Sequence, residues 1–383
     1  MRAMPGSPSQ PPSANEPAAR IAHVIVALRG GGAEHSLQRL VTADDQFTHT
    51  VFCFGEPTPL GAAMADAGVE VHYLPLNPLA VWRLRNTLLR ERFRLVHGWM
   101  YYGALLAALV RSRGAGQRLI WNLRTSLDGA PLSGRLRLTM GLLRWLRRDM
   151  VVFNSHAGLA SHTQLGFARP QHCVISNGID LERFRPDPAR RQVWRKNQQL
   201  DATTRAVALV GRWHEDKGVG DFLAAGARLL TQADVPPVRL FLIGAGMTTD
   251  NPALTQQLQS AGLKPEQLTL LPEQPDIEAA YAGMDLLVLA SHREGLPNVM
   301  LEAMACGTPV VGTRVGDVPR IQPDELFTAP PKDVDALFAV LCFALAYGAD
   351  GVAANRQRVQ ETYGLQQCIE AYAELHKRLL EQP

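Results

Sequence analysis

One stretch of the chain combines carboxylates, a proline and a glycine in an order that suits the binding of a polyol diphosphate. Residues 291–311 read SHREGLPNVMLEAMACGTPVV and follow an apolar segment that predicts a buried strand. Pro297 stands where a first helical turn tolerates proline, and Gly307 is expected to end the helix after about two turns. The amides at the start of such a helix, with its positive dipole end, favour an anion such as a phosphate.

The two carboxylates of this stretch are expected at different depths. Glu294 precedes the expected helix and Glu302 lies inside it, so they do not form a paired acid and base. Each can accept hydrogen bonds from hydroxyl groups, and two carboxylates that bind polyol groups on either side of a diphosphate are the chemistry of a sugar nucleotide site. Taken singly, Glu294 would suit a helix cap and Glu302 a solvated face, but the complete string favours the binding site.

A second motif, VGRWHEDKG at 210–218, follows the first expected strand of the second half of the chain. Gly211 allows a tight turn, and Arg212 and Lys217 bring two cations to the mouth of a sheet, which match the charges of a diphosphate. These cations would take the place of a metal ion. On its own, the motif is also compatible with a solvent-exposed loop.

Two further glycine-rich turns are weaker signals. Gly30, Gly31 and Gly32 follow the first expected strand and open a helix, so their backbone can approach a ligand closely. Gly244 and Gly246 follow another strand but lack the third glycine of a dinucleotide-binding fingerprint. A nicotinamide dehydrogenase is therefore the least favoured enzyme class.

Short apolar runs rich in β-branched residues alternate with helical patterns, which predicts βαβ units around parallel sheets. The expected strands are 21–28, 50–54, 69–74, 95–97, 119–122, 151–154 and 173–176 in the first half, and 205–210, 238–243, 268–271, 286–289 and 309–312 in the second. We therefore predict an α/β protein with two Rossmann-like, doubly wound parallel-sheet domains that face each other across a cleft. Ligands should bind there, at the carboxyl ends of the strands.

The chain of 383 residues has the composition of a globular protein, with 46% apolar and 20% charged residues. We expect a disordered leader at 1–20 without a secretion signal, a first domain at 21–183, a polar linker at 184–204 and a second domain at 205–383. The last helix could pack back on the first domain. The five scattered cysteines form no C-x-x-C pair, which fits a reducing cytosolic compartment, and no apolar stretch approaches the ~20 residues of a membrane span.

The net charge of +3 hides an asymmetry between the two halves. Residues 1–185 carry 21 Arg, no Lys and 12 Asp+Glu, whereas the remainder carries 18 Lys+Arg and 24 Asp+Glu. Much of the excess lies at 83–94 and 135–148. In the second stretch the apolar residues fall at helical spacing between arginines, as in a basic amphipathic helix, and they are Leu136, Met140, Leu143 and Leu146.

Two interpretations of this basic helix remain open. It would suit docking on an anionic membrane surface or binding of an anionic acceptor, or its apolar stripe would be ordinary core. Nucleic acid is not an expected partner, because no recognition motif accompanies the charge.

In these strings the chain resembles the retaining glycosyltransferases of family 4, which have the two-domain GT-B architecture. The resemblance extends from Ile21 to the last helix and includes the segments 153–155 and 174–180. It implies that Glu302 binds the ribose hydroxyls of a nucleotide sugar and that Glu294 binds the donor sugar. The other groups that it places at the donor are Arg212 and Lys217 on the diphosphate, Gly32 beside it, and Gly244, Gly295, Leu296 and Pro297 around it.

The segment 96–102 resembles the strand and loop that bring a histidine to the reacting sugar, which makes His97 a catalytic candidate. The alternative is a histidine satisfied in the core, because Trp99 stands where relatives often carry a second histidine. Trp99 and Arg124 are the acceptor candidates. Two departures from the family pattern, Pro319-Arg320 for the usual Pro-Glu and 271–273 for a strand-end glycine, make the donor harder to predict.

The resemblance implies a retaining transfer of a hexosyl unit from a nucleotide diphosphate sugar to a hydroxyl of a glycan or lipid-linked acceptor. The catalytic candidates are His97, Glu294, Arg212 and Lys217, and neither a metal ion nor another cofactor is expected. The basic first domain favours cell-envelope polysaccharide or glycolipid synthesis by a cytoplasmic protein that is peripheral on the inner face of the cell membrane. A sugar-nucleotide epimerase of the same architecture and a non-catalytic nucleotide-sugar-binding protein remain as alternatives.

Overall fold

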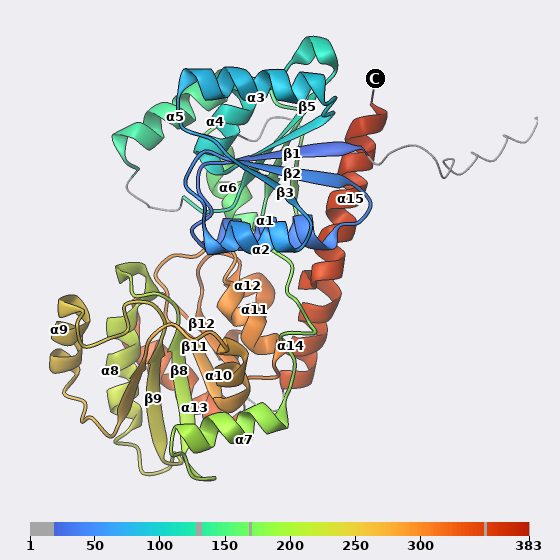
Figure 1. Cartoon of the computed structure of the whole chain (residues 1–383). Coiled ribbons are helices and arrows are strands. Elements are labelled where there is room, and N and C mark those ends of the chain that lie inside the picture. Colours follow the sequence, from blue (N-terminus) through green and yellow to red (C-terminus); the bar gives the residue numbers. More distant parts are fainter. Residues whose placement is uncertain (1–18, 128–131, 168–170, 348–350, 383) are drawn as a thin grey trace, which may run out of the picture.

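The computed structural model describes residues 19–127, 132–167, 171–347 and 351–382. It contains two parallel β-sheets, one in each half of the chain, with helices on both faces of each sheet (Figure 1). The expected leader at 1–20 lies almost entirely outside the described residues. The predicted fold class, with two doubly wound Rossmann-like domains, is confirmed.

The N-terminal sheet has seven strands in the order β3-β2-β1-β4-β5-β6-β7, all parallel. This order reverses direction between β1 and β4, which places a topological switch point at the carboxyl ends of these two strands. The strands are β1 (Arg20–Ile25), β2 (Thr48–Cys53), β3 (Glu70–Tyr73), β4 (Leu95–Trp99), β5 (Arg118–Leu123), β6 (Met150–Phe153) and β7 (His172–Val174).

Helices cover the two faces of this sheet in two groups (Figure 1). One face packs against α1 (Gly32–Ala43), α2 (Pro59–Asp66) and the C-terminal α15 (Leu365–Glu381), and the other against α3 (Pro78–Arg90), α4 (Met100–Val110), α5 (Gly134–Trp145) and α6 (His156–Gln164). Polar residues fix where four of these helices begin. The side chains of Thr58, Asn77, Ser133 and Ser155 accept a hydrogen bond from the backbone amide three residues on.

The C-terminal sheet has six strands in the order β10-β9-β8-β11-β12-β13, again all parallel. The strands are β8 (Arg205–Val210), β9 (Val238–Ile243), β10 (Leu268–Leu271), β11 (Leu286–Leu289), β12 (Val310–Thr313) and β13 (Thr328–Ala329). The helices are α7 (Pro188–Asn197), α8 (Val219–Leu229), α9 (Pro252–Ala261), α10 (Ile277–Gly283), α11 (Asn298–Ala305), α12 (Val318–Ile321), α13 (Val334–Tyr347) and α14 (Val352–Arg358). The two-residue β13 is the one strand of this sheet that the sequence did not predict.

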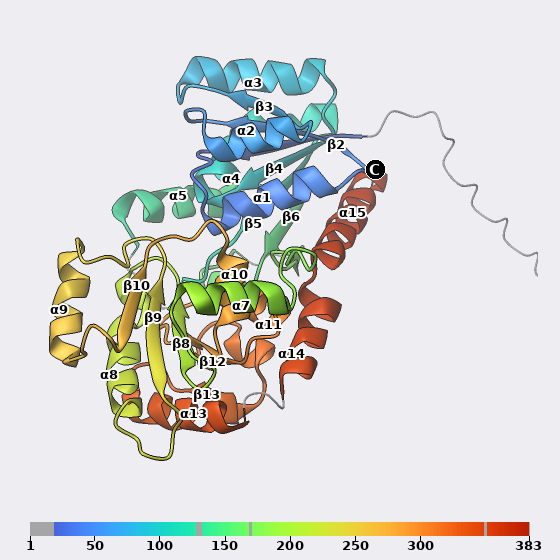
Figure 2. The ribbon, with the colours of Figure 1, turned by 60° about the horizontal axis from the view of Figure 1, so that its bottom comes forward.

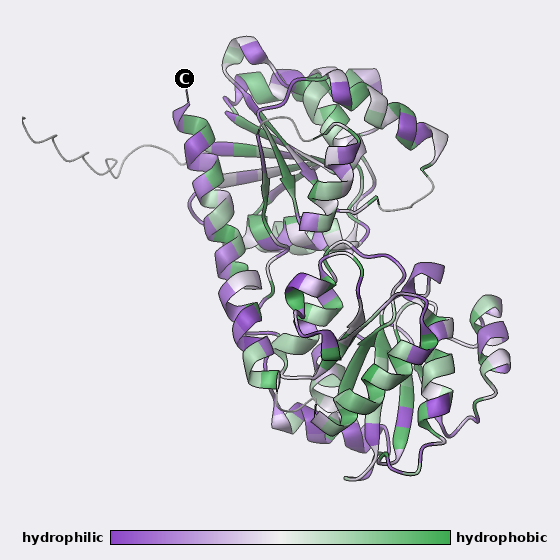
Figure 3. Ribbon diagram, turned by 180° about the vertical axis from the view of Figure 1, so that it is seen from behind, coloured by the Kyte–Doolittle hydropathy of each residue, from purple (hydrophilic) through white to green (hydrophobic). Residues whose placement is uncertain are grey.

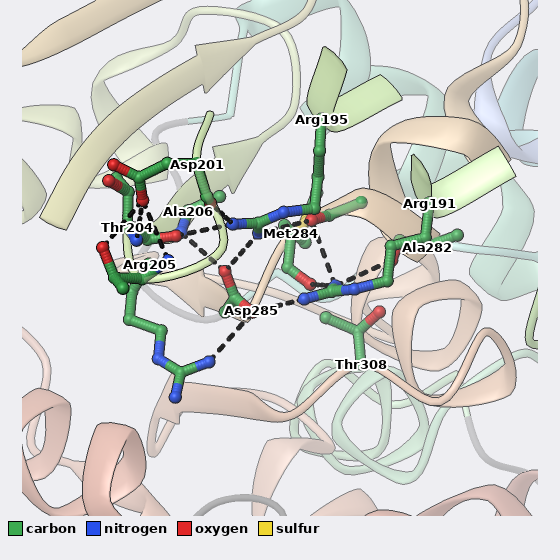
Figure 4. Close-up of polar contacts among 12 residues, drawn as sticks. Arg191, Arg195, Asp201, Thr204, Arg205, Ala206, Ala282, Met284, Asp285 and Thr308 are labelled. Atoms are coloured by element: carbon green, nitrogen blue, oxygen red, sulfur yellow. Dashed lines mark hydrogen bonds and ion pairs between the residues drawn. The ribbon is translucent and has the colours of Figure 1, made fainter. Parts of the chain in front are cut away.

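The segment expected as a polar linker contains α7, which packs on the C-terminal domain. Asp285, just before β11, explains this packing (Figure 4). Its carboxylate accepts hydrogen bonds from Arg191 at 2.6 Å and Arg195 at 2.8 Å, both on α7. Burial alone would raise the pKa of Asp285, but hydrogen bonds from the Ala206 amide and Arg191 hold it below its ordinary value. Trp194, on the same helix, is buried in the core.

The end of the chain returns from the C-terminal domain to the N-terminal one (Figures 1 and 2). α15 alternates hydrophilic and hydrophobic residues along its length (Figure 3), and its buried side chains join the core beside α1. These side chains include Cys368, Tyr372, Leu375 and Leu379. One helix therefore ties the last residues of the chain to its first strands.

Within the described residues no single helix is both long enough and apolar enough to cross a membrane. The segments Val334–Tyr347 and Val352–Tyr363 meet the length and composition limits only as a pair, which is bent by 104°.

Candidate functional site

The loops that follow β8 and β11 lie side by side at the carboxyl ends of these neighbouring strands, and they carry the two strongest sequence motifs. Arg293 binds the Asp216 carboxylate with two hydrogen bonds of 2.9 and 2.8 Å. The Nε2 atom of His292 lies 2.8 Å from Asp221 Oδ2, and the backbone amide of His292 donates to the Asp216 carbonyl at 2.7 Å. Sequence reasoning did not single out these pairs. They fix the relative position of the two motifs.

Lys217 and Glu294, one from each motif, are in direct contact. The Lys217 Nζ atom lies 2.6 Å from Glu294 Oε1, and the Ser291 hydroxyl donates to the same oxygen at 2.8 Å. Glu294 Oε2 has no partner among the described residues, so it can accept a hydrogen bond from a ligand hydroxyl. Arg212 is exposed in the same loop as Lys217 and forms no ion pair with any described residue. The structure thus brings together three of the four residues predicted as catalytic.

Glu302 lies on α11 and Glu294 lies in the loop before that helix, as the sequence predicted. The Tyr281 hydroxyl donates to Glu302 Oε2 at 3.0 Å. Burial raises the pKa of Glu302, and the hydrogen bond from Tyr281 and the positive charge of Arg39 offset part of this effect. A carboxylate held in this way is a strong acceptor for hydroxyl groups.

Arg39 is a cation at the domain boundary that sequence reasoning missed. It lies on α1 of the N-terminal domain, where the Glu302 carboxylate of the other domain acts on it electrostatically. Its Nε and Nη2 atoms are buried and have no hydrogen-bond partner among the described residues. Burial lowers the pKa of Arg39, and Glu302 opposes this change. The one sequence signal was an arginine between the buried Leu37 and Leu40 on an otherwise ordinary helix.

The predicted glycines play different parts. Gly32 is exposed at the start of α1, and a Cβ atom there would meet no atom within 4 Å, so this side of the turn is open. The neighbouring Gly31 amide donates to the Glu34 carboxylate, which occupies part of the same turn. Gly244 has φ of 139°, and a Cβ there would lie 2.2 Å from the Gly211 carbonyl. Gly244 therefore allows the loop after β9 to support the loop that carries Arg212 and Lys217.

Gly295, Leu296 and Pro297 lead into α11 as expected. Pro297 is the N-cap residue and the helix begins at Asn298. The amides of Gly295 and Leu296 have no hydrogen-bond partner among the described residues, so they remain available to an anion at the helix start.

The structure does not place His97 or Trp99 at the cleft. Both side chains are fully buried, with 0% exposure, on β4. Asn122 lies 2.9 Å from His97 Nδ1, and the Trp99 indole donates to His23 at 3.1 Å. These contacts favour the core histidine that the sequence left as the alternative to a catalytic His97, and they leave Trp99 without the exposed surface that an acceptor contact needs. Tyr372 and His376 of α15 lie against the His97 ring and cover it.

Arg124 follows β5 and lies at the junction of the two domains. Its guanidinium donates to Asn177 Oδ1 at 2.6 Å and to the Tyr372 hydroxyl at 2.9 Å. The Nε atom is buried without a partner among the described residues. Arg124 is therefore fixed in place and keeps one donor free, which is compatible with the acceptor contact predicted for it.

The two domains also contact each other near the start of α11. The Asp317 carboxylate accepts hydrogen bonds from the His156 and Ala157 amides, both at 2.8 Å. These amides belong to the first turn of α6. A carboxylate of the C-terminal domain therefore lies at the positive end of a helix of the N-terminal domain. Asn298 accepts a third interdomain hydrogen bond, from Asn177, at 2.7 Å.

Replacing Asp317 by asparagine should lower the free energy of unfolding by about 1 kcal/mol, because the charge that complements the helix dipole is lost. Urea unfolding of the full chain measures the change. Asp66→Asn is a suitable control, since Asp66 is exposed and has no partner among the described residues. Equal stability of the two variants would show that the negative charge of Asp317 contributes nothing to stability.

A cavity of about 530 Å³ lies elsewhere, near the start of β11, and none of the predicted site residues lines it. Its walls include Arg191, Met284, Cys306 and Val352. We therefore do not assign this cavity to the site. Among the described residues, no group of three or more His, Cys, Asp and Glu side chains is arranged to hold a metal ion.

Two protein-family models match the chain. Residues 30–183 match the model for Glycosyltransferase Family 4, and residues 204–346 match the model for Glycosyl transferases group 1. Together the two matches include both strong motifs and the glycine-rich turn.

A similar curated protein is a D-inositol 3-phosphate glycosyltransferase of Segniliparus rotundus, 33% identical over 183 residues. The match covers 46% of this chain and 40% of that protein, so the chain spans about two fifths of the length of this relative.

Two solved structures share the fold. HepE of Anabaena, in complex with UDP and glucose, has a TM-score of 0.82 and 20% identity over 94% of this chain and 100% of that chain. Sucrose-phosphate synthase of Thermosynechococcus elongatus has a TM-score of 0.76 and 18% identity over 94% of this chain and 99% of that chain.

Proposed function

The chain belongs to family 4 of the glycosyltransferases, and on this premise we propose that it transfers a hexosyl unit from a nucleotide diphosphate sugar to a hydroxyl of a glycan or lipid-linked acceptor. The proposed reaction retains the configuration of the sugar and needs no metal ion. The observation that carries the proposal is the contact of 2.6 Å between Lys217 and Glu294. It places a cation suited to a diphosphate beside a carboxylate suited to sugar hydroxyls.

The proposed donor site extends from this pair in two directions. Glu302 accepts hydrogen bonds from the ribose hydroxyls, and Glu294 accepts them from the sugar through its unpartnered Oε2. Arg212 joins Lys217 on the diphosphate, and the amides of Gly295 and Leu296 add donors. HepE of Anabaena, which shares the fold, has been solved with UDP and with UDP-glucose, so a uridine nucleotide is the first donor to test.

In the proposed mechanism the acceptor hydroxyl attacks the anomeric carbon from the face on which the diphosphate leaves. The hydroxyl proton passes to the departing diphosphate oxygen, whose charge Lys217 and Arg212 stabilise. Glu294 is proposed to bind the hydroxyls of the donor sugar and not to act as a nucleophile. Closure of the domains over the donor would exclude water from this step.

Two arginines support an acceptor that carries an anionic group. Arg39 and Arg124 belong to the N-terminal domain, and each keeps a buried nitrogen without a partner among the described residues. A similar curated protein is a D-inositol 3-phosphate glycosyltransferase, whose name includes a phosphorylated polyol. We propose a phosphate-bearing acceptor in cell-envelope polysaccharide or glycolipid synthesis, and a cytoplasmic protein that acts at the inner face of the cell membrane.

A thermal-shift series with UDP, GDP, ADP and their sugar conjugates, in the absence of metal, tests the donor site. One nucleotide family should stabilise the folded chain by about 2.7 kcal/mol at a concentration of 100 Kd. Glu302→Gln and Arg212→Ala should remove most of this stabilisation. Glu266→Gln, at an exposed carboxylate without a partner among the described residues, should keep it.

The outcome separates the proposal from its alternatives. Stabilisation without release of nucleoside diphosphate in the presence of any acceptor would favour a nucleotide-sugar-binding protein. Failure of every nucleotide to stabilise the folded wild-type chain would remove the basis for the proposed donor site.

A further inference from the structure

Large apolar side chains are exposed on the outer sides of α3, α4 and α5. Trp145 is 89% exposed and Leu138 is 68% exposed on α5, and Trp82 is 59% exposed on α3. Most of the exposed large apolar side chains in the described part of the chain lie on or beside these three helices, and the others here are Leu76, Leu79, Leu89, Tyr102, Leu109 and Leu142. Such a concentration on one face usually marks an interaction surface.

The exposed residues of α5 form a stripe that is separate from its buried one. Leu138, Leu142 and Trp145 are spaced by four and three positions, so they share one side of the helix. The stripe that the sequence analysis singled out faces the core instead, where Met140 and Leu143 are buried. The basic helix therefore has an ordinary packed face and a second apolar face that no described residue covers.

α3 repeats this arrangement. Leu79, Trp82 and Leu89 lie on its outer side, while Leu84 and Leu88 are buried in the same core that holds α5. Both helices contact α4, and Figure 1 shows the three helices together on the side of the sheet opposite α1 and α2. The exposed apolar residues thus belong to one layer of the N-terminal domain.

Positive charge without negative charge surrounds these residues. The sequence contains no Asp or Glu at 76–90 or at 132–148. Exposed arginines flank the two stripes and form no ion pair with a described residue, and they include Arg83, Arg135, Arg137, Arg144 and Arg147. Tryptophan and leucine side chains with unpaired arginines beside them are the combination that binds the interface of an anionic bilayer.

We propose that the outer face of α3 and α5 docks on a membrane that contains anionic lipids. Trp82, Leu138 and Trp145 enter the interface between headgroups and acyl chains, and the flanking arginines bind lipid phosphates. A second copy of the chain fits this surface poorly, because symmetric contact would bring the unpaired arginines of both copies together. None of the proposed donor-site residues lies on this surface, so docking and sugar transfer can fail independently in experiments.

Flotation of the full chain with vesicles tests the surface. The chain should bind vesicles of phosphatidylcholine with phosphatidylglycerol at low salt, bind those of phosphatidylcholine alone far less, and lose binding at high salt. The double variant Leu138→Ser and Trp145→Ser should bind anionic vesicles about tenfold more weakly. Arg135→Gln with Arg137→Gln should also weaken binding and reduce its salt dependence.

Matched controls keep the test decisive. Leu326→Ser removes a leucine that is 57% exposed on the C-terminal domain, and it should bind like the wild type. Because the substituted side chains are exposed, the thermal unfolding of every variant should match the wild type. Equal vesicle binding by the double variant and the wild type would overturn the proposal. An absence of wild-type binding to anionic vesicles would also overturn the proposal. If the double variant then disrupted a dimer, the surface would be a contact between two copies of the chain.

Discussion

Replacing Lys217 by methionine should reduce turnover at least about 100-fold while the chain stays folded. Lys217 lies 2.6 Å from Glu294, on the loop that the proposed mechanism places beside the leaving diphosphate. Removing one preorganised donor from a developing charge costs roughly 3 kcal/mol of transition-state stabilisation. Methionine keeps the length and most of the apolar contacts of the side chain, so the loss reports on the charge.

The measurement is the release of nucleoside diphosphate from the sugar nucleotide that the thermal-shift series identifies. The decrease should appear in kcat more than in KM, because the charge on the diphosphate grows in the transition state. Ser291 still donates to the Glu294 carboxylate when Lys217 is replaced, so the variant should stay folded, and its melting temperature checks this. Lys264→Met removes an exposed lysine outside the site and should leave kcat unchanged. A Lys217→Met enzyme with kcat within about twofold of the wild type would place Lys217 away from the leaving group.

The sequence predicted the fold well because most strands are short apolar runs with clear ends. The bounds of β8, β9, β10 and β11 agree with the structure residue for residue. The helix α7 was missed because its arginines and prolines resemble a solvated linker. Its arginines are in fact bound to Asp285, which is distant in the sequence. A charge pattern alone does not show whether its partner is water or a buried carboxylate.

The candidate site divides in the same way. Glu294 and Lys217 were predictable because each lies just after a strand of one parallel sheet, whose carboxyl ends must meet at one edge. His97 also lies near the end of a strand, but α15 covers it with Tyr372 and His376 from the far end of the chain. The burial of Arg39 and its proximity to Glu302 also depend on packing between residues that are distant in the sequence. Sequence order does not reveal which strand ends are covered.

The covering of His97 creates a buried histidine cluster that should make the protein sensitive to acid. His23, His97 and His376 are all fully buried. Trp99 donates to His23 Nδ1, and Asn122 can only donate to His97 Nδ1 through its amide nitrogen. If His23 or His97 were protonated at Nδ1, the new N–H group would point at the N–H group of Trp99 or Asn122 and the hydrogen bond would be lost. Neither ring nitrogen of His376 has a partner among the described residues.

The pKa of each of these three histidines is lowered, and in each case burial is the main cause. The pKa of His376 falls to about 3. In the unfolded chain a histidine has a pKa of about 6.5, so below that pH the unfolded state binds more protons than the folded one. The contribution of the neutral histidines to the free energy of unfolding is therefore complete above about pH 6.5, and it is lost as the pH falls below this value. At about pH 5.5 the loss is on the order of 1 kcal/mol for each histidine that stays neutral in the folded chain.

Urea unfolding at about pH 7.5 and about pH 5.5 measures this loss, and His376→Phe should reduce it by about a third, because one titrating group is removed. The ring centroids of His376 and Phe47 are 5.2 Å apart in an edge-on contact, which a phenylalanine at position 376 can keep. Phe47→Leu disturbs the same packing without removing a titrating group, so it should lower stability equally at both pH values. The raised pKa of Glu302 acts in the opposite direction but is common to all three proteins. If His376→Phe lost as much stability in acid as the wild type, His376 would not contribute to the acid sensitivity.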